Sequence, residues 1–164
     1  MSRLQVRRAD SKYCRITGIS PSLAVCLHEL PATLELRNKP AAHARLFPAP
    51  TANEEALNRD WAEAVQPELQ HLFASAAETV ARDLAQLRPN PRHPDRYFVT
   101  IPLAHVPAWT NALNQARLIL AALAHLDEID MNMRYDQLPP AKAPFVVRVD
   151  QYGLLLEKFV AREF

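Results

Sequence analysis

Four ionisable side chains stand close together where a long apolar stretch of the sequence ends. They are His125, Asp127, Glu128 and Asp130. An imidazole beside carboxylates is a combination that enzymes use to move protons, so this segment is the first candidate for general acid–base catalysis. The same composition is also typical of a solvated loop. We interpret the segment as such a loop and keep an acid–base role as the alternative.

Two thiols and two imidazoles raise the question of a metal site. One residue separates Cys26 from His28, and Cys14 and His43 lie on either side of them in the sequence. This spacing fits no zinc pattern, and Cys26 falls on the apolar face of its predicted helix. The six histidines show no HExxH spacing, and neither cysteine belongs to a recognisable nucleophile motif. The sequence therefore predicts no metal, no cofactor and no catalytic residue.

Polar residues interrupt the most apolar segment of the chain. Asn114 and Arg117 are three residues apart, so on a helix both side chains can reach a common partner. They would form either a site for a ligand or peptide carboxylate, or a polar clasp that ties the core helix to its surroundings. Arg45 has the same two interpretations. It would clasp an acidic residue of the segment 54–68, or form a docking motif with the two apolar residues that follow it.

The basic N-terminal segment offers a second candidate surface. Residues 3–8 and 12–17 alternate in type around a short turn, which predicts a β-hairpin. Arg3, Arg7 and Arg15 then share its outer face. Such a face either resists aggregation as a solvated surface or forms a docking patch for an acidic partner. The inner face is predicted to hold Leu4, Val6, Cys14 and Ile16.

The element that must position these residues is the segment 108–126. Apolar residues recur in it at spacings of four and three, and further apolar residues fill most of the remaining circumference. A helix that is apolar nearly all round is normally the central member of a bundle. We therefore expect a buried helix over residues 107–126, with Trp109 in the core and other helices packed on several sides. If Trp109 lay at the surface instead, it would be a candidate for interaction.

Proline and capping residues divide the chain before this helix. A helix is predicted to begin at Pro21 with Ser20 as its N-cap, and Pro31 predicts a kink or a break near Leu30. A short helical turn follows over residues 40–47.

One long helix is predicted over residues 52–87. Thr51 and Glu54 fit a capping box at its start, and Pro67 is expected to kink it. Its first half is acidic, with five carboxylates between residues 54 and 68. The stripe that defines it, predicted to be buried, consists of Leu57, Trp61, Val65, Leu69, Leu72, Ala76, Val80, Leu84 and Leu87.

The remaining elements are short. Residues 88–96 contain three prolines and are predicted to form a loop. Residues 97–101 are expected to join the hairpin as a third strand, because an isolated hairpin is only marginally stable. Residues 145–160 are predicted to be a helix, with a strand over residues 145–149 as the alternative.

Composition narrows the class of protein. The chain has 164 residues, of which 49% are hydrophobic, and a net charge of +1, which predicts a single domain over residues 1–164 with a sizeable core. Residues 1–50 carry eight Lys or Arg against three Asp or Glu, whereas the rest carries eleven against fifteen. This asymmetry is too mild for a dedicated nucleic-acid binder but suits a protein partner. The sequence shows no signal segment and no membrane span, so we expect a cytoplasmic protein with reduced thiols.

Three motifs carry a resemblance to a known family. Residues 45–48 (Arg-Leu-Phe-Pro) precede an acidic amphipathic helix, residues 108–118 hold Ala-Trp, Ala-Leu-Asn and Arg-Leu in order, and residues 152–157 look like a closing helix. With these motifs the chain resembles a bacterial family catalogued as a domain of unknown function, family twenty-seventeen. Gln115 stands where that family often has Asp, so the chain is similar to a divergent member. The genes of many members lie beside that of ClpS, the adaptor of the Clp protease, so the resemblance implies a link to proteolysis or regulation.

These observations together predict a fold and a class of function. We expect a mostly helical bundle around the central helix, with a small antiparallel sheet formed by the hairpin and residues 97–101. Because the sequence shows a large core and no catalytic constellation, we expect a protein–protein interaction or regulatory module. Its partner is another protein, and the division of charge would also allow a homo-oligomer. The alternatives are a DNA-binding transcriptional regulator, which requires a basic face on an exposed helix, and a small enzyme of unknown reaction.

Overall fold

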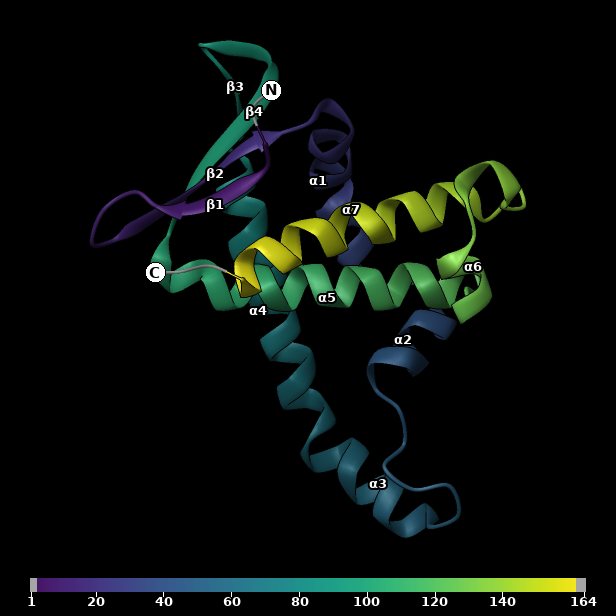
Figure 1. The fold of residues 1–164 in the computed structure, drawn as a ribbon. Helices are drawn as coiled ribbons and strands as arrows, with labels where there is room; N and C mark the ends of the chain where they lie inside the picture. The colour runs from purple at the N-terminus through teal and green to yellow at the C-terminus, as the bar shows by residue number, and fades with distance from the viewer. Residues whose placement is uncertain (1–2, 162–164) are drawn as a thin grey trace.

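The computed structural model describes residues 3–161 and shows a mostly helical protein with one small antiparallel sheet, which confirms the predicted fold class (Figure 1). The strands are β1 (Gln5–Arg8), β2 (Tyr13–Ile19), β3 (Arg88–Asn90) and β4 (His93–Pro102). The helices are α1 (Pro21–Leu34), α2 (Pro40–Leu46), α3 (Glu55–Ala64), α4 (Gln66–Leu84), α5 (Val106–Leu123), α6 (Glu128–Asn132) and α7 (Ala143–Val160). No helix in this range is both long and apolar enough to cross a membrane.

The sheet has the strand order β1-β2-β4-β3, and all its pairs are antiparallel. The predicted hairpin and third strand are confirmed, and the four expected inner-face residues are buried. The loop predicted over residues 88–96 is wrong, because β3 pairs with the start of β4. Pro89 is tolerated there because β3 is an edge strand, where a missing amide breaks no ladder on the open side.

A glycine in β2 allows the chain to pass close to the N-terminal segment. Gly18 lies in the irregular stretch of β2 and has a φ of 70°. A Cβ atom at this position would collide with the backbone carbonyl of Arg3. Only glycine combines this backbone conformation with this approach.

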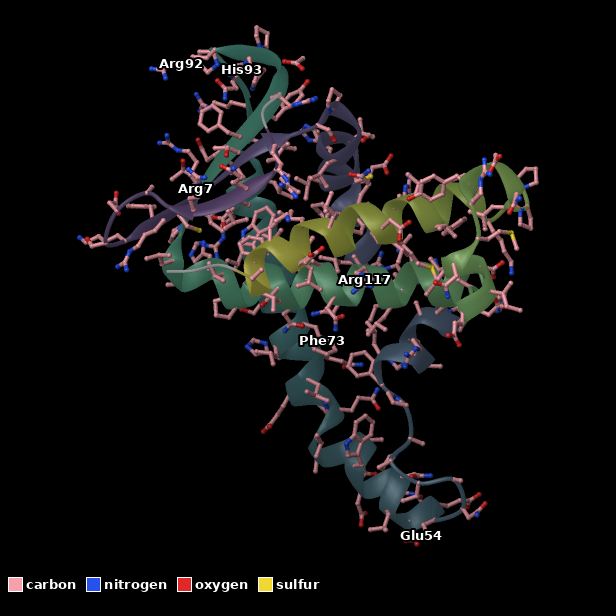
Figure 2. The ribbon with its side chains drawn as sticks, in the orientation of Figure 1. Arg7, Glu54, Phe73, Arg92, His93 and Arg117 are labelled. Carbon is pink, nitrogen blue, oxygen red and sulfur yellow. The ribbon has the colours of Figure 1, made fainter. Side chains whose placement is uncertain are left out.

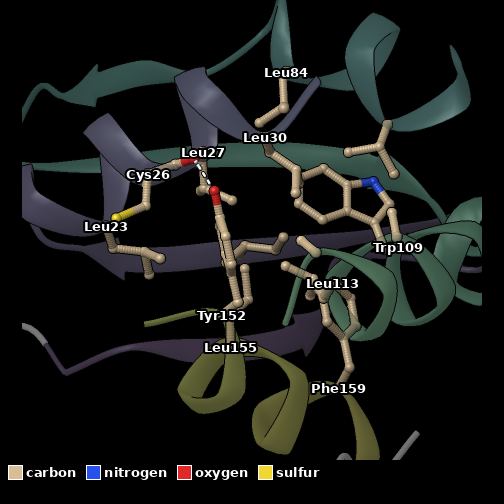
Figure 3. Close-up of a cluster of buried hydrophobic side chains, with 14 of the residues drawn as sticks. Leu23, Cys26, Leu27, Leu30, Leu84, Trp109, Leu113, Tyr152, Leu155 and Phe159 are labelled. Atoms are coloured by element: carbon tan, nitrogen blue, oxygen red, sulfur yellow. Dashed lines mark hydrogen bonds between the residues drawn. The ribbon is translucent and has the colours of Figure 1, made fainter. Parts of the chain in front are cut away.

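Helix α5 forms the centre of the core, as predicted. Trp109 and Leu113 are fully buried, and α5 packs against α7, α4, α2 and α1. Helices α5 and α7 run side by side in Figure 1. Figure 3 shows Trp109 beside Phe159 of α7, with the two ring centroids 5.9 Å apart. Tyr152 of α7 also donates a hydrogen bond to the carbonyl oxygen of Cys26 at 2.5 Å, which fixes α7 on α1.

Helix α1 begins at Pro21 with Ser20 as its N-cap, as predicted. Of the kink or break expected near Leu30, the break is wrong, because the helix continues through Pro31 to Leu34. Its final turn is stabilised from outside the helix, since Lys39 Nζ donates to two carbonyl oxygens of that turn at 3.0 and 3.1 Å.

The single helix predicted over residues 52–87 is wrong, because two helices, α3 and α4, meet at Val65. Pro67 explains the division. Its ring would clash with the carbonyl of Glu63 in a continuous helix, whereas in the first turn of α4 the missing amide costs nothing.

The predicted capping box is only half present. The Thr51 hydroxyl accepts the amide of Glu54 at 3.2 Å. Asn58 closes the turn, accepting from the Thr51 amide at 3.1 Å and donating to the Thr51 carbonyl at 3.0 Å. The helix therefore begins at Glu55, one turn later than predicted.

The apolar stripe of these two helices is buried only in its second half, which corrects the prediction of a continuous buried face. Ala76 and Val80 of α4 reach the core, whereas α3 has no buried residue. Residues 51–75, which we call the arm, project away from the helical body (Figure 1). The exposed apolar side chains of the arm are Leu57, Val65 and Leu72, with exposed fractions of 50%, 40% and 55%.

The last helix, α7, is helical from Ala143 to Val160, so the strand considered for residues 145–149 is wrong. Its buried residues recur at three- and four-residue spacings and face α5: Val146, Val149, Tyr152, Leu155 and Phe159.

Candidate functional site

A buried carboxylate joins α4 to the central helix. Asp83 accepts a hydrogen bond from Trp109 Nε1 at 2.8 Å and contacts His105 Nδ1 at 2.9 Å. His105 is partly exposed, so the cluster extends from the core to the surface. A carboxylate that orients an imidazole through Nδ1 also occurs in catalytic sites. Here the carboxylate also accepts a hydrogen bond from the indole N–H of Trp109. A tryptophan buried in a core needs such an acceptor.

Sequence reasoning missed this cluster because Asp83 lies 22 and 26 residues from its two partners. One signal was available. Asp83 stands among the core-facing positions of the stripe that ends at Leu87, and a carboxylate in such a position must be paired. Trp109, a candidate for interaction in the sequence, is fully buried by this arrangement.

Asn114 and Arg117 share no hydrogen-bond or ion-pair partner among residues 3–161. The Asn114 side chain is exposed, whereas Arg117 is half-buried and lies against Gly153 of α7. A Cβ atom at position 153 would be 3.3 Å from Arg117 Nε, so the glycine makes room for the guanidinium. Arg117 Nε is buried and makes no hydrogen bond. Arg117 therefore contacts the neighbouring helix α7. A polar clasp between helices would make the same kind of contact.

Arg45 is exposed on α2, and no ion pair of the described residues includes it. Phe47, which a docking motif would display beside it, is buried. The Phe47 ring lies 4.9 Å from that of His43 and 5.5 Å from that of Phe73, measured between centroids. These contacts tie the end of α2 to α4.

The ionisable segment 125–130 is an exposed loop up to Asp127, as predicted, but α6 begins at Glu128 and Asp130 is buried. The side chains of Asp127 and Asp130 each accept the other's backbone amide, at 2.8 and 3.1 Å, and this capping box begins α6. Lys142 Nζ lies 2.7 Å from the Asp130 carboxylate. Their hydrogen bond lowers the pKa of Asp130 and raises the pKa of Lys142. The carboxylate of Asp130 is therefore committed to the cap and to this ion pair.

The two thiols lie in the core. Cys14 and Cys26 are both buried, and burial raises the pKa of the Cys26 thiol. A thiol that stays protonated is a poor nucleophile and a poor metal ligand. Within residues 3–161, no group of three or more His, Cys, Asp or Glu side chains is placed to hold a metal ion.

The outer face of the sheet is basic. Arg7 of β1 lies directly opposite Arg15 of β2, and Arg3 is exposed just before β1. Arg15 is held in place, because its Nε donates to Thr100 Oγ1 at 3.1 Å and its guanidinium carbon lies 5.7 Å from the centroid of the Phe98 ring. We call Arg3, Arg7 and Arg15 the basic face. A groove of about 680 Å³ beside the edge strand β1 adds two more cations, Arg8 and Lys158.

A second groove opens where the arm leaves the helical body. This arm groove has a volume of about 430 Å³ and lies between the end of α1, α2 and α4. Its polar residues include two exposed carboxylates, Glu35 and Glu78, and His43, whose Nε2 lies 3.3 Å from Gln70 Nε2. Its lining contains no Lys or Arg, and its apolar residues are Pro31, Leu34, Leu36, Phe47, Phe73, Ala74 and Ala77.

The basic face and the arm lie at opposite ends of the molecule. Figure 2 shows Arg7 at the sheet and Glu54 at the tip of the arm, with the helical body between them. None of the ion pairs found among residues 3–161 connects the two surfaces. The charge of the arm comes from five exposed carboxylates and one exposed arginine: Glu54, Glu55, Asp60, Glu63, Glu68 and Arg59.

These features define a mostly helical protein with a small antiparallel sheet, a projecting helical arm and two oppositely charged surfaces. The family model described as "Domain of unknown function (DUF2017)" matches residues 15–161, so the chain belongs to this family. The match confirms the resemblance that its sequence motifs indicate. No curated protein and no solved structure matches the chain.

Proposed function

We propose that the protein is a cytoplasmic protein–protein interaction module that binds an acidic partner through its basic face. The observation that carries the proposal is the cross-strand pair of Arg7 and Arg15. Like charges on directly opposite residues destabilise a sheet, so this pair costs stability unless an anion neutralises it. The acidic arm does not do so, because it lies at the other end of the molecule.

The geometry of the basic face suits carboxylates. Arg15 is fixed by Thr100 and by the Phe98 ring, so less side-chain entropy is lost when its guanidinium binds a carboxylate. The groove beside β1 continues the positive surface around the sheet edge to Lys158. An extended acidic segment along that edge would meet cations over its whole length.

The sequence resemblance suggests where such a partner occurs. Neighbouring genes often act in one process, and the ClpS neighbourhood of this family supports a partner in regulated proteolysis. A DNA-binding regulator is the rival, and it normally places its basic residues on an exposed recognition helix. In this chain the basic face lies on a sheet, which favours the protein partner.

A comparison of charge variants tests the proposal. The triple variant Arg3→Glu, Arg7→Glu and Arg15→Glu is used as bait beside the unchanged protein in an affinity pull-down from native cytoplasm. We expect the unchanged protein to retain an acidic protein that the triple variant loses. The association rate of the purified pair should fall with added salt, because electrostatic steering is screened.

A matched control separates the basic face from net charge. The variant Arg37→Glu, Arg82→Glu and Arg134→Glu changes charge by the same amount at exposed positions elsewhere, and it should retain the partner. Equal loss with both triple variants, recovery of nucleic acid, or no partner from either protein would contradict the proposal.

A further inference from the structure

Much of the arm extends beyond the body, and its side chains Leu57, Val65 and Leu72 are exposed. Helix α3 buries no residue, and α4 buries residues only from Ala76 onward. Val65 and Leu72 belong to the same stripe as Ala76, so the exposed stripe continues the core-facing side of α4 outward. Exposed apolar side chains in such a row mark an interaction surface.

The arm groove provides a place where an apolar side chain would be enclosed. Phe73 and Ala74 of α4 face Leu34 of α1 across a space of about 430 Å³. One side of the groove is well packed, because Phe47 is buried and contacts the Phe73 ring. Most of its lining residues lie on helices, whose backbone amides and carbonyls are already paired, so recognition here must use side chains rather than an added strand.

The charge around the groove decides which side chains fit. Glu35 and Glu78 stand in the lining without any Lys or Arg, and the arm beyond them carries five carboxylates against one arginine. A partner that inserts an apolar side chain here therefore meets one carboxylate at the end of α1 and another on α4. Basic residues flanking that apolar side chain would be attracted, and acidic residues would be repelled.

We propose that the arm groove binds a basic amphipathic helix whose apolar face packs on Phe73, Ala74 and Ala77. This site is separate from the basic face and would bind a partner of the opposite charge, so the protein would bridge two partners. The arm of a second copy is excluded as the occupant because it is acidic itself and would repel this surface.

A designed peptide pair tests this site directly. The probe is a synthetic amphipathic helix with leucines on one face and lysines on the other, and its control has each lysine replaced by glutamate. Isothermal titration at low salt with the unchanged protein should show binding of the lysine peptide and not of the glutamate peptide. Absence of binding by the lysine peptide, or equal binding of both peptides, would overturn the proposal.

Two variants locate the binding in the groove. Ala74→Trp fills the groove from an exposed position, and the pair Glu35→Lys and Glu78→Lys reverses its charge. Each should raise the Kd of the lysine peptide at least about tenfold, a loss that corresponds to about 1.4 kcal/mol. Circular dichroism melting checks that both variants remain folded, and the charge variant stays decisive if the tryptophan weakens the fold.

Matched controls carry the same chemical changes elsewhere. Ala85→Trp lies at the exposed end of α4, and the pair Glu128→Lys and Glu157→Lys is exposed on α6 and α7. Both should bind the lysine peptide like the unchanged protein. If the control charge pair weakens binding as much as the groove pair, the peptide responds to net charge and the groove is not its site. The result of the peptide titration does not depend on the result of the pull-down through the basic face.

Discussion

Removing the side chain of Trp109 should take away a large part of the stability of the fold. The ring is fully buried, packs against Phe159, and donates to Asp83. Truncation of a buried aromatic residue to alanine costs about 3–5 kcal/mol, out of an ordinary total of about 5–15 kcal/mol. Trp109→Ala should therefore lower the free energy of unfolding by about 3–5 kcal/mol, with the loss of a hydrogen-bond donor to Asp83 favouring the upper end.

A double-mutant cycle isolates the hydrogen bond from the packing. Trp109→Phe keeps most of the ring and removes a bond to a charged acceptor, at a cost of about 1.5–3 kcal/mol. Asp83→Ala should cost about 3–5 kcal/mol, because it leaves the indole N–H buried without an acceptor. In the double variant the N–H is absent as well, so the combined loss should be smaller than the sum by about 1–2 kcal/mol.

Urea unfolding followed by far-UV circular dichroism is the appropriate assay. Fluorescence is unsuitable because Trp109 is one of only two tryptophans in the chain. A loss below about 1 kcal/mol for Trp109→Ala would show that the side chain is not a core residue. A coupling energy near zero would show that the bond to Asp83 contributes no stability.

Three smaller perturbations test other parts of the structure. Gly18→Ala should destabilise the fold by more than about 2 kcal/mol in urea, because its φ is 70° and the new Cβ meets the Arg3 carbonyl; an unchanged midpoint would refute this reasoning. Lys142→Met should lower the melting temperature at pH 7 but not near pH 2. Lys142 lowers the pKa of Asp130, so the ionised carboxylate stabilises the fold above its unfolded pKa of about 4, and this contribution is lost as the pH falls. Leu72→Ala should change the free energy of unfolding by less than about 0.5 kcal/mol, and a loss above 2 kcal/mol would mean that the arm packs against the body.

Periodic patterns predicted the elements that are buried on one side. The stripe through Trp109 and Leu113 located α5, and the alternation of residues 3–8 and 12–17 located the hairpin. Both signals arise because burial selects one face of an element with a fixed period. The inner face of the hairpin and the core position of α5 were therefore available from the sequence.

Predictions from periodic patterns failed where the apolar residues of the pattern are not buried. The stripe from Leu57 to Leu72 has the period of a buried helix, but within residues 3–161 its side chains Leu57, Val65 and Leu72 stay exposed. A periodic pattern shows that one face of a helix is apolar, but it does not show what packs against that face. The three prolines of residues 88–96 likewise suggested a loop, although an edge strand accepts proline.

The surfaces were harder to predict than the core. Asp83, His105 and Trp109 meet only because two helices cross, and no local spacing encodes that contact. The arm groove also needs three helices to be placed together. The basic face was visible in advance because hairpin register follows from local alternation, which placed Arg7 and Arg15 on one side.

We expect helix α4 to belong to two units that open independently, because its residues are buried only from Ala76 onward. Backbone amides from Ala76 onward lie beside the core, and they exchange with solvent only when the core itself opens. Amides before Ala76 lie in the arm, where little apolar contact opposes a local opening. Deuterium uptake along this one helix should therefore change abruptly near Ala76, and a protease should cut the arm while the core stays intact. A ligand of the arm groove would contact α1 and α2 as well as α4, so it would slow that cleavage and also stabilise the folded body.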